Sequence, residues 1–277
     1  MKFIVAGYGF VGSAIGELLS KQHEVVPVDP RFNNNKIKDH MGDSDGIIIA
    51  VSTPAKKNGS VNADNIYNVL QQVEESGFKF KPILIKSTVT FDHLQDISKE
   101  FSITFYPEFL REATAMEDFV NQKYAILGGD HTRDTKFWAD LLYSSLPLIE
   151  HIHTCSLTEA SIVKYFANSF LATKLTFFNE LYELCNRTNA NYDTVSNLLG
   201  LDTRIGKGHT TVPGPDKQFG WGGHCFPKDT SAILKLSDEL EVDLSVLKQA
   251  IKSNKKHRKK NLTLRHEVKY NKGTNGE

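Results

Sequence analysis

Cysteine, methionine and tryptophan are scarce in this chain of 277 residues, which contains three, three and two of them. Three cysteines without paired spacing argue against a disulfide framework and predict a reducing, cytoplasmic compartment. No apolar run approaches the roughly 20 residues of a membrane-spanning helix, and the first apolar run starts at residue 2, so we expect neither a membrane segment nor a signal peptide. A surplus of charge is also missing, because 33 basic residues balance 33 acidic ones, which argues against a nucleic-acid-binding protein.

What the sequence does contain is an alternation of apolar runs and helical patterns in its first half. Short apolar runs bounded by glycine or polar residues predict strands, and helical patterns separate several of them. This alternation predicts an α/β fold with an N-terminal Rossmann-type, doubly wound parallel sheet. The predicted strands span residues 2–6, 24–29, 46–51, 82–87, 103–106 and 124–128, and the clearest helices span 11–22, 63–76 and 132–142.

The second half has a different character. Residues 157–187 contain neither Gly nor Pro and predict one long helix, with shorter helices at 192–199, 229–240 and 244–253. We therefore expect three parts: a Rossmann-type domain over 1–150, a mainly α-helical central domain over 151–253, and a basic tail over 254–277. The tail is predicted to be disordered, with an anion-contacting role as the alternative.

A glycine-rich motif, Gly7-Tyr8-Gly9-Phe10-Val11-Gly12, directly follows the first predicted strand and opens the first predicted helix. In such a turn the first glycine allows a tight bend, the second lets the backbone approach a pyrophosphate, and the third lets helix and strand pack closely. The helix N-terminus supplies amide donors for the phosphates. The motif therefore predicts a dinucleotide site, the alternative being a glycine turn without a ligand.

Asp29 ends the second predicted strand, twenty residues after Gly9. A carboxylate at this place accepts hydrogen bonds from the adenosine ribose and repels a 2′-phosphate, which favours NAD over NADP. Arg31 weakens that preference, because an arginine nearby can accommodate the phosphate.

Seven short segments carry a resemblance to a known family. They occur in order over residues 1 to about 255, and together they resemble the UDP-glucose/GDP-mannose dehydrogenase family. The resemblance implies an NAD-dependent enzyme that oxidises the C6 alcohol of a nucleotide sugar, UDP-glucose foremost, to a uronic acid in two hydride transfers. It also implies a homodimer built on the long helix. The segments are residues 7–12, 51–54, 86–89, 107–112, 164–170, 204–206 and 222–229.

Cys225 is the expected nucleophile. It lies in a glycine-rich stretch, predicted to be a flexible loop, where His224 and Lys228 can favour the reactive thiolate. A thiolate adds to an aldehyde to give a thiohemiacetal, and loss of a hydride then gives a thioester. The alternative, a small buried hydrophobe, suits Cys155 and Cys185 better than Cys225.

Lys164 and Asn168 are four residues apart and share one face of the long helix. Aimed at a polar cavity, they could stabilise a developing oxyanion, and the resemblance gives Lys164 that part or the part of a base. The resemblance also implies that Asp229 orders the hydrolytic water, with an N-cap of the following helix as the alternative role.

The resemblance implies the remaining site residues position by position. Thr88 and Glu108 match positions that bind water or assist proton transfer near the nicotinamide. The glycine motif, including Phe10 and Val11, would contact the cofactor together with Thr53, Pro54 and Thr88. The expected substrate contacts are Phe109, Leu110, Arg111, Glu112, Lys164, Asn168, Arg204 and Gly222, with Arg204 reaching toward a neighbouring subunit's site.

Two departures from the family pattern leave alternatives open. Ala113 stands where a glycine usually follows Arg-Glu. Family members also carry a third, C-terminal α/β domain that grips the nucleotide, and we expect this chain to lack it. The alternatives are therefore a subunit that needs a partner to supply that domain, a non-catalytic NAD-binding subunit, and a simple two-electron hydroxy-acid dehydrogenase.

His151, His153 and Cys155 have no second half of a metal site in the sequence, so no metal is expected.

Overall fold

The computed structural model describes residues 1–110, 114–129 and 132–272 and divides into two compact units. The first comprises Met1–Lys57 and Val61–Lys164, and the second comprises residues 58–60 and Tyr165 onward. Arg111, Glu112 and Ala113 lie outside the described residues. Each unit is described by itself below.

The first unit is built on a seven-stranded sheet with the order β2-β1-β3-β4-β5-β6-β7. Strands β1 to β5 run parallel to one another, β6 is antiparallel to β5, and β7 is parallel to β6. This confirms the predicted α/β sheet, with one antiparallel pairing that the sequence pattern did not reveal. The strands are β1 (Lys2–Ala6), β2 (Glu24–Val28), β3 (Gly46–Ile49), β4 (Ile83–Ile85), β5 (Ile103–Phe105), β6 (Tyr124–Gly128) and β7 (His151–Cys155).

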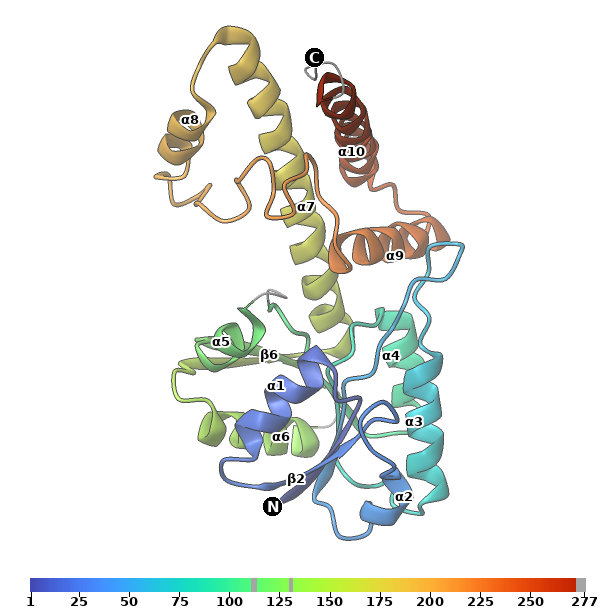
Figure 1. Ribbon diagram of the computed structural model, residues 1–277. Coiled ribbons are helices and arrows are strands. Elements are labelled where there is room, and N and C mark those ends of the chain that lie inside the picture. The colour runs from blue at the N-terminus through green and yellow to red at the C-terminus, as the bar shows by residue number, and fades with distance from the viewer. Residues whose placement is uncertain (111–113, 130–131, 273–277) are drawn as a thin grey trace. The chain divides into compact units, whose positions relative to one another are not determined.

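Helices cover both faces of this sheet (Figure 1). One face carries α1 (Phe10–Leu19) and α6 (Thr132–Ser145), with α5 (Ala115–Val120) packed against α1, and the other carries α2 (Ile37–His40), α3 (Asp64–Glu75) and α4 (Phe91–Ser98). The central strands are buried on both sides, which is why they appear in the sequence as unbroken apolar runs rather than as alternating patterns.

The six predicted strands agree with β1 to β6 to within two residues at each end. The strand β7 contains His151 and Cys155, for which a strand or surface position was the favoured interpretation over a metal cluster. Its residues are half-buried or exposed and give a weak apolar signal, because the strand closes the edge of the sheet.

The long helix α7 runs Leu157–Thr188 and contributes to both units. It confirms the helix predicted over 157–187, and it ends where Asn189 adopts a left-handed backbone conformation with φ of 55°. The second unit adds α8 (Tyr192–Leu199), α9 (Cys225–Glu239) and α10 (Ser245–Lys272), and a small core joins Phe178, Cys185, Tyr192 and Val212.

Helix α10 continues well beyond residue 253, where the predicted helix ended, and its first half packs on the loop before α9. Asn254 accepts a hydrogen bond from the Trp221 N–H at 2.7 Å and donates to the Trp221 carbonyl at 3.0 Å. Arg258 donates to the same carbonyl and to Asp216, both within 2.9 Å. These contacts join residues more than 30 positions apart in the sequence. They stabilise this part of α10, where the sequence no longer shows apolar residues at helical spacing. None of the helices in the described part of the chain is long and apolar enough to span a membrane.

Candidate functional site

The glycine motif forms the strand-turn-helix arrangement that the sequence predicts. Gly7 follows β1 with φ of +85°, and a Cβ there would lie 2.7 Å from the Ala50 carbonyl oxygen. A Cβ on Gly12 would lie 1.9 Å from the Gly7 carbonyl oxygen. Gly9 is the N-cap of α1, so the first N–H groups of the helix, beginning at Phe10 and Val11, point out of the turn. The turn is therefore shaped for a close backbone approach and fits the pyrophosphate of a dinucleotide.

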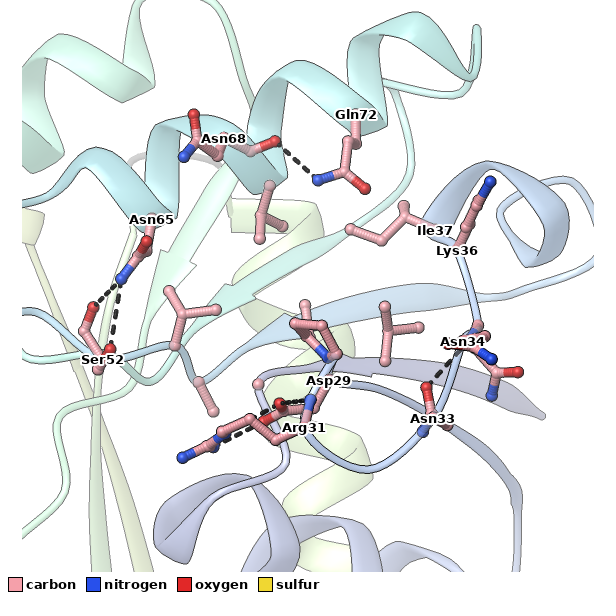
Figure 2. Close-up of a pocket in the computed structure, with 18 residues that line it drawn as sticks. Asp29, Arg31, Asn33, Asn34, Lys36, Ile37, Ser52, Asn65, Asn68 and Gln72 are labelled. Atoms are coloured by element: carbon pink, nitrogen blue, oxygen red, sulfur yellow. Dashed lines mark hydrogen bonds and ion pairs between the residues drawn. The ribbon is translucent and has the colours of Figure 1, made fainter.

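A cavity of about 860 Å³ lies beside this turn, at the carboxyl ends of β1, β2 and β3 (Figure 2). It sits where the sheet order changes direction, because β2 and β3 flank β1 on opposite sides. Ligands of open α/β sheets bind at this kind of switch point. Its lining includes Gly7, Asp29 and Arg31, and Asn65 and Asn68 from α3.

Asp29 is 4% exposed and its carboxylate is fully occupied by neighbouring donors. Arg31 binds it with two side-chain bonds of 3.0 and 2.7 Å and with its backbone N–H at 3.0 Å, and the Tyr8 N–H adds a bond of 2.9 Å. The Arg31 guanidinium is the main cause that holds the pKa of Asp29 far below its usual range. Asp29, the predicted ribose acceptor, lines this cavity, and the Arg31 guanidinium pairs directly with its carboxylate (Figure 2).

Thr53 and Thr88 meet at the same edge of the sheet, after β3 and β4. The Thr53 hydroxyl donates to the Thr88 carbonyl at 2.7 Å, and Ser87 donates to the Val51 carbonyl at 2.7 Å. Thr53 is buried, Thr88 is half-buried and Pro54 is exposed. The two loops are thus fixed to each other by side-chain to backbone bonds.

Glu108 and Lys164 form a buried ion pair beyond β5. The Lys164 ammonium lies 3.5 Å from the Glu108 carboxylate and also donates to the Glu108 backbone carbonyl. Their side chains are only 11% and 4% exposed. Burial raises the pKa of Glu108, but the Lys164 ammonium and the Leu110 N–H outweigh burial, so the pKa lies below its usual value. Glu108 is therefore held as a carboxylate.

Lys86 lies in the same motif as Thr88, and the sequence alone predicted no role for it. It is 1% exposed, and its ammonium lies 3.4 Å from the centre of the Tyr106 ring and 5.3 Å from that of Phe119. It finds no hydrogen-bond partner among the described residues. Burial lowers the pKa of Lys86 to about 7, an effect that Glu108 opposes and Lys164 reinforces. The sequence signal that could have singled out this residue is its position directly after a buried apolar strand.

The substrate residues predicted after β5 are only partly described. Phe109 is 37% exposed, and the Lys164 ammonium lies 5.5 Å from its ring centre. Leu110 is half-buried and its N–H donates to Glu108 at 3.0 Å. Arg111 and Glu112 lie outside the described residues.

In the second unit, Cys225 is exposed and is the first residue of α9. This corrects the expectation that it lies in a flexible loop, because the helix begins four residues earlier than predicted. The N–H groups of the first helical turn stabilise negative charge, so this position favours a thiolate. Asp229 is consequently inside α9, and the alternative role as an N-cap is wrong, since His224 occupies that position.

Asp229 is 1% exposed and pairs with two side chains. Asn168 of α7 donates to it at 2.6 Å, and Lys228 lies 2.5 Å from its other oxygen. Asp229 lies four residues after Cys225, hence one turn along the same face of α9. The structure therefore groups Cys225, Asp229 and Asn168 in the second unit, and Glu108, Lys164 and Thr88 in the first.

Two predicted substrate residues lie elsewhere in the second unit. Arg204 is 88% exposed in its side chain and is held by Asp202 at 2.6 Å. A Cβ on Gly222 would lie 2.1 Å from the Arg258 guanidinium, so this glycine permits the close packing of α10 on the loop. Among the described residues, no group of three or more His, Cys, Asp and Glu side chains is placed to hold a metal ion.

The buried lysine generates a prediction about stability. An unfolded chain binds a proton on lysine up to pH about 10, whereas folded Lys86 releases it near pH 7, so its burial penalty is largest below pH 7 and shrinks as the pH rises. Lys86→Met should therefore stabilise the protein more at pH 6 than at pH 9, with a difference on the order of 2 kcal/mol. Urea unfolding of both proteins at the two pH values measures this difference.

Lys99→Met is the control for this experiment, because Lys99 is 72% exposed and pairs with Asp96 on the surface. Its effect on the free energy of unfolding should be small and nearly independent of pH. An equal stabilisation by Lys86→Met at pH 6 and pH 9 would contradict the assignment of the low pKa.

Comparison with known proteins places the two halves of the chain in one family. Residues 31–146 match the model described as the UDP-glucose/GDP-mannose dehydrogenase family, NAD binding domain, and residues 158–256 match that family's central domain. A UDP-glucose 6-dehydrogenase of Rickettsia felis is 36% identical over 231 residues, which cover 80% of this chain and 50% of that protein. The chain thus spans about half the length of the curated relatives it matches.

Solved structures agree with this assignment. The UDP-glucose dehydrogenase of Pyrobaculum islandicum superposes with a TM-score of 0.81 at 26% identity, covering 92% of this chain and 68% of that chain. A 3-hydroxyisobutyrate dehydrogenase of Mycobacterium tuberculosis has a TM-score of 0.72 at 15% identity, covering 93% and 94% of the two chains, and shows the likeness of fold alone. With both domain models matched in order, the chain belongs to the UDP-glucose/GDP-mannose dehydrogenase family.

Proposed function

We propose that this chain is an NAD-dependent nucleotide-sugar 6-dehydrogenase that oxidises a C6 alcohol, UDP-glucose being the first candidate, to the uronic acid. The observation that carries the proposal is an exposed thiol at the start of α9, one helical turn from a buried carboxylate. Such a pair serves covalent capture of an aldehyde followed by hydrolysis, which a simple alcohol oxidation does not need. The curated relatives named UDP-glucose 6-dehydrogenase support the choice of substrate.

In this proposal the first unit holds the cofactor. The glycine turn of Gly7, Gly9 and Gly12 and the N-terminus of α1 bind the pyrophosphate, and the cavity beside Asp29 takes the adenosine. NAD, when bound, accepts one hydride in each of the two oxidation steps. Thr53 and Thr88 line the adjoining edge of the sheet, where their mutual bond fixes the loops that approach the nicotinamide.

In this proposal the buried ionisable groups of the first unit accept the substrate's proton and stabilise the negative charge that develops on its oxygen. Glu108 is held as a carboxylate by Lys164, so it can accept a proton from a water or from the substrate alcohol. Lys164 carries the charge that stabilises a developing alkoxide. Lys86 supplies a second amine near Glu108, with a pKa of about 7 that allows it to gain or lose a proton near neutral pH.

Cys225 carries the covalent steps. Its thiolate adds to the C6 aldehyde to form a thiohemiacetal, whose C6 hydride then leaves to give a thioester. Water attacks the thioester carbonyl and the thiolate departs, which releases the carboxylic acid. Asp229 accepts the proton of that water, and Asn168, which donates to Asp229 at 2.6 Å, fixes the carboxylate in position.

This proposal predicts two NADH for each sugar oxidised by the purified chain, measured at 340 nm against the uronic acid formed. Cys225→Ser should abolish acid production, because a serine hydroxyl stays protonated and is a far poorer nucleophile than a thiolate, and an alkoxide is a poorer leaving group than a thiolate. Cys155→Ser is the matched control, since Cys155 lies half-buried in β7 and should leave the yield unchanged.

The stoichiometry separates this function from the alternatives. One NADH per substrate indicates a two-electron alcohol dehydrogenase, and NAD binding without turnover on any nucleotide sugar indicates a non-catalytic or partner-dependent subunit. Full acid production by Cys225→Ser would contradict the assignment of the nucleophile.

We also propose that the chain forms a homodimer through α7. Phe170 and Phe177, seven residues apart on one face of that helix, are 66% and 62% exposed. Phe166, one turn before Phe170, is 45% exposed, and together these rings form an apolar stripe. Exposed apolar stripes of this kind mark protein contacts. Three reduced cysteines are consistent with the cytoplasmic location that we propose for the dimer.

The dimer predicts that Phe170→Glu shifts the protein to half its mass in sedimentation equilibrium, because a buried charge opposes association. Phe80→Glu is the control, since Phe80 is 65% exposed in the first unit and lies off this stripe. A wild-type mass of one chain at micromolar concentration would overturn the proposal.

A further inference from the structure

The loop that leads into α9 (Figure 1) contains Trp221, four residues before Cys225. All polar groups of Trp221 are bonded to side chains of other helices. Its backbone N–H donates to the Asn254 amide oxygen at 2.7 Å, and its carbonyl accepts from the Asn254 amide at 3.0 Å and from Arg258 Nε at 2.9 Å. Its indole N–H donates to the Thr176 hydroxyl of α7 at 2.9 Å. Trp221 is 5% exposed and is therefore fixed by α7 and α10 together.

Asn254 is matched to the backbone of Trp221 by its own chemistry. A side-chain amide presents an acceptor and a donor side by side, which is what the N–H and C=O of a single residue require. Asn254 is 7% exposed and lies inside α10, where asparagine is a poor helix former. Loss of its amide would remove the acceptor of a buried Trp221 N–H, which is costly. The Asn254 side chain thus stabilises the loop rather than its own helix.

The glycines on either side of Trp221 let α10 approach the backbone of the loop closely. A Cβ on Gly220 would lie 2.3 Å from the Asn254 amide oxygen. A Cβ on Gly222 would lie 2.1 Å from the Arg258 guanidinium. The contact with α10 therefore extends over three consecutive loop residues, and a side chain at either glycine would disturb it.

Cys225 lies midway between two points at which the chain is fixed. Trp221 is four residues before it, and Asp229, four residues after it, accepts a 2.6 Å hydrogen bond from Asn168 of α7. The N-cap of α9, His224, makes no capping bond with its side chain within the described part of the chain. The start of the helix is thus placed by the loop before it and not by a cap of its own. A shift of Trp221 consequently moves the thiol.

We propose that Asn254 and Arg258 are positioning residues for Cys225, because they hold the backbone of Trp221 just before α9 begins. They keep the thiol in the first turn of α9, where the helix N–H groups favour a thiolate. The inference rests on the proposed role of Cys225 as the nucleophile and adds two residues that support it. Neither residue has to touch the substrate for this purpose, since both act through the loop.

The test is alkylation of Cys225 by iodoacetamide in the full chain across the neutral pH range, followed by mass spectrometry of the peptide that carries it. In Asn254→Ala the pH of half-maximal alkylation rate should rise by about one unit, because a displaced thiol loses the helix N–H groups that stabilise its charge. The kcat for acid formation should fall about 10-fold or more, since small misplacements of a reacting group are costly. The Kd of NAD+ should stay unchanged, because the glycine turn lies in the first unit.

Arg258→Met tests the same contact with less risk to folding. The Arg258 side chain is 23% exposed, and it shares the Trp221 carbonyl with Asn254. This variant should shift the alkylation profile in the same direction by a smaller amount. It carries the test if Asn254→Ala does not fold.

Two further substitutions in α10 are the controls. Leu247 is 7% exposed and lies seven residues before Asn254, so Leu247→Ala should lower the Tm without moving the alkylation profile. Lys255 is exposed and adjacent to Asn254, and Lys255→Ala should change neither the Tm nor the profile. Thermal unfolding of all the variants shows which of them are folded and how far each is destabilised.

The outcomes separate this inference from the proposed function. A wild-type alkylation profile in Arg258→Met, and in Asn254→Ala where it folds, overturns the inference and leaves the dehydrogenase proposal standing. An equal shift in Leu247→Ala also overturns it, because loss of stability would then account for the effect. If the profile shifts as expected but Cys225→Ser still forms acid, the positioning of the thiol stands and the proposed nucleophile is wrong.

Discussion

The parallel pairing of β1 to β5 is the constraint on which the first unit depends. Parallel strands end at one edge of the sheet, so the residues that follow them gather there whatever their distance in sequence. Gly7, Asp29, Thr53, Thr88 and Glu108 come after five different strands and share this edge. The glycine turn, the cavity and the buried ion pair are consequences of that one arrangement.

The first unit also buries three charged side chains beyond β4 and β5. Lys86, Lys164 and Glu108 lie close together, almost without access to water, and two ammonium groups face one carboxylate. The single carboxylate can neutralise only one of the two ammonium groups, and Lys164 makes the direct contact with it. Burial therefore lowers the pKa of Lys86. Groups arranged in this way are costly for stability and common at functional sites.

The pairing of Asp29 with Arg31 changes the charge and the hydrogen bonding at the end of β2. An acid at the end of the second strand favours NAD when it stands alone, because it binds hydroxyls and repels phosphate. Here the acid is buried, saturated with donors and neutralised, and the exposed group is a cation. The sequence contains both residues two positions apart, but only the structure shows that they pair directly and that the arginine is the exposed partner.

The sequence by itself determined the α/β fold, the glycine turn and the long helix, because buried strands, special backbone conformations and uninterrupted helical periodicity are local properties. It did not determine that Cys225 starts α9, that α10 extends past Ser253, or that β6 runs antiparallel to β5. Those features depend on contacts between distant segments, as when Asn254 and Arg258 hold the Trp221 carbonyl. The saturation of Asp29 and the isolation of Lys86 were likewise decided by tertiary structure, because hydrogen-bond satisfaction and burial are set by what packs around a side chain and not by its neighbours in the chain.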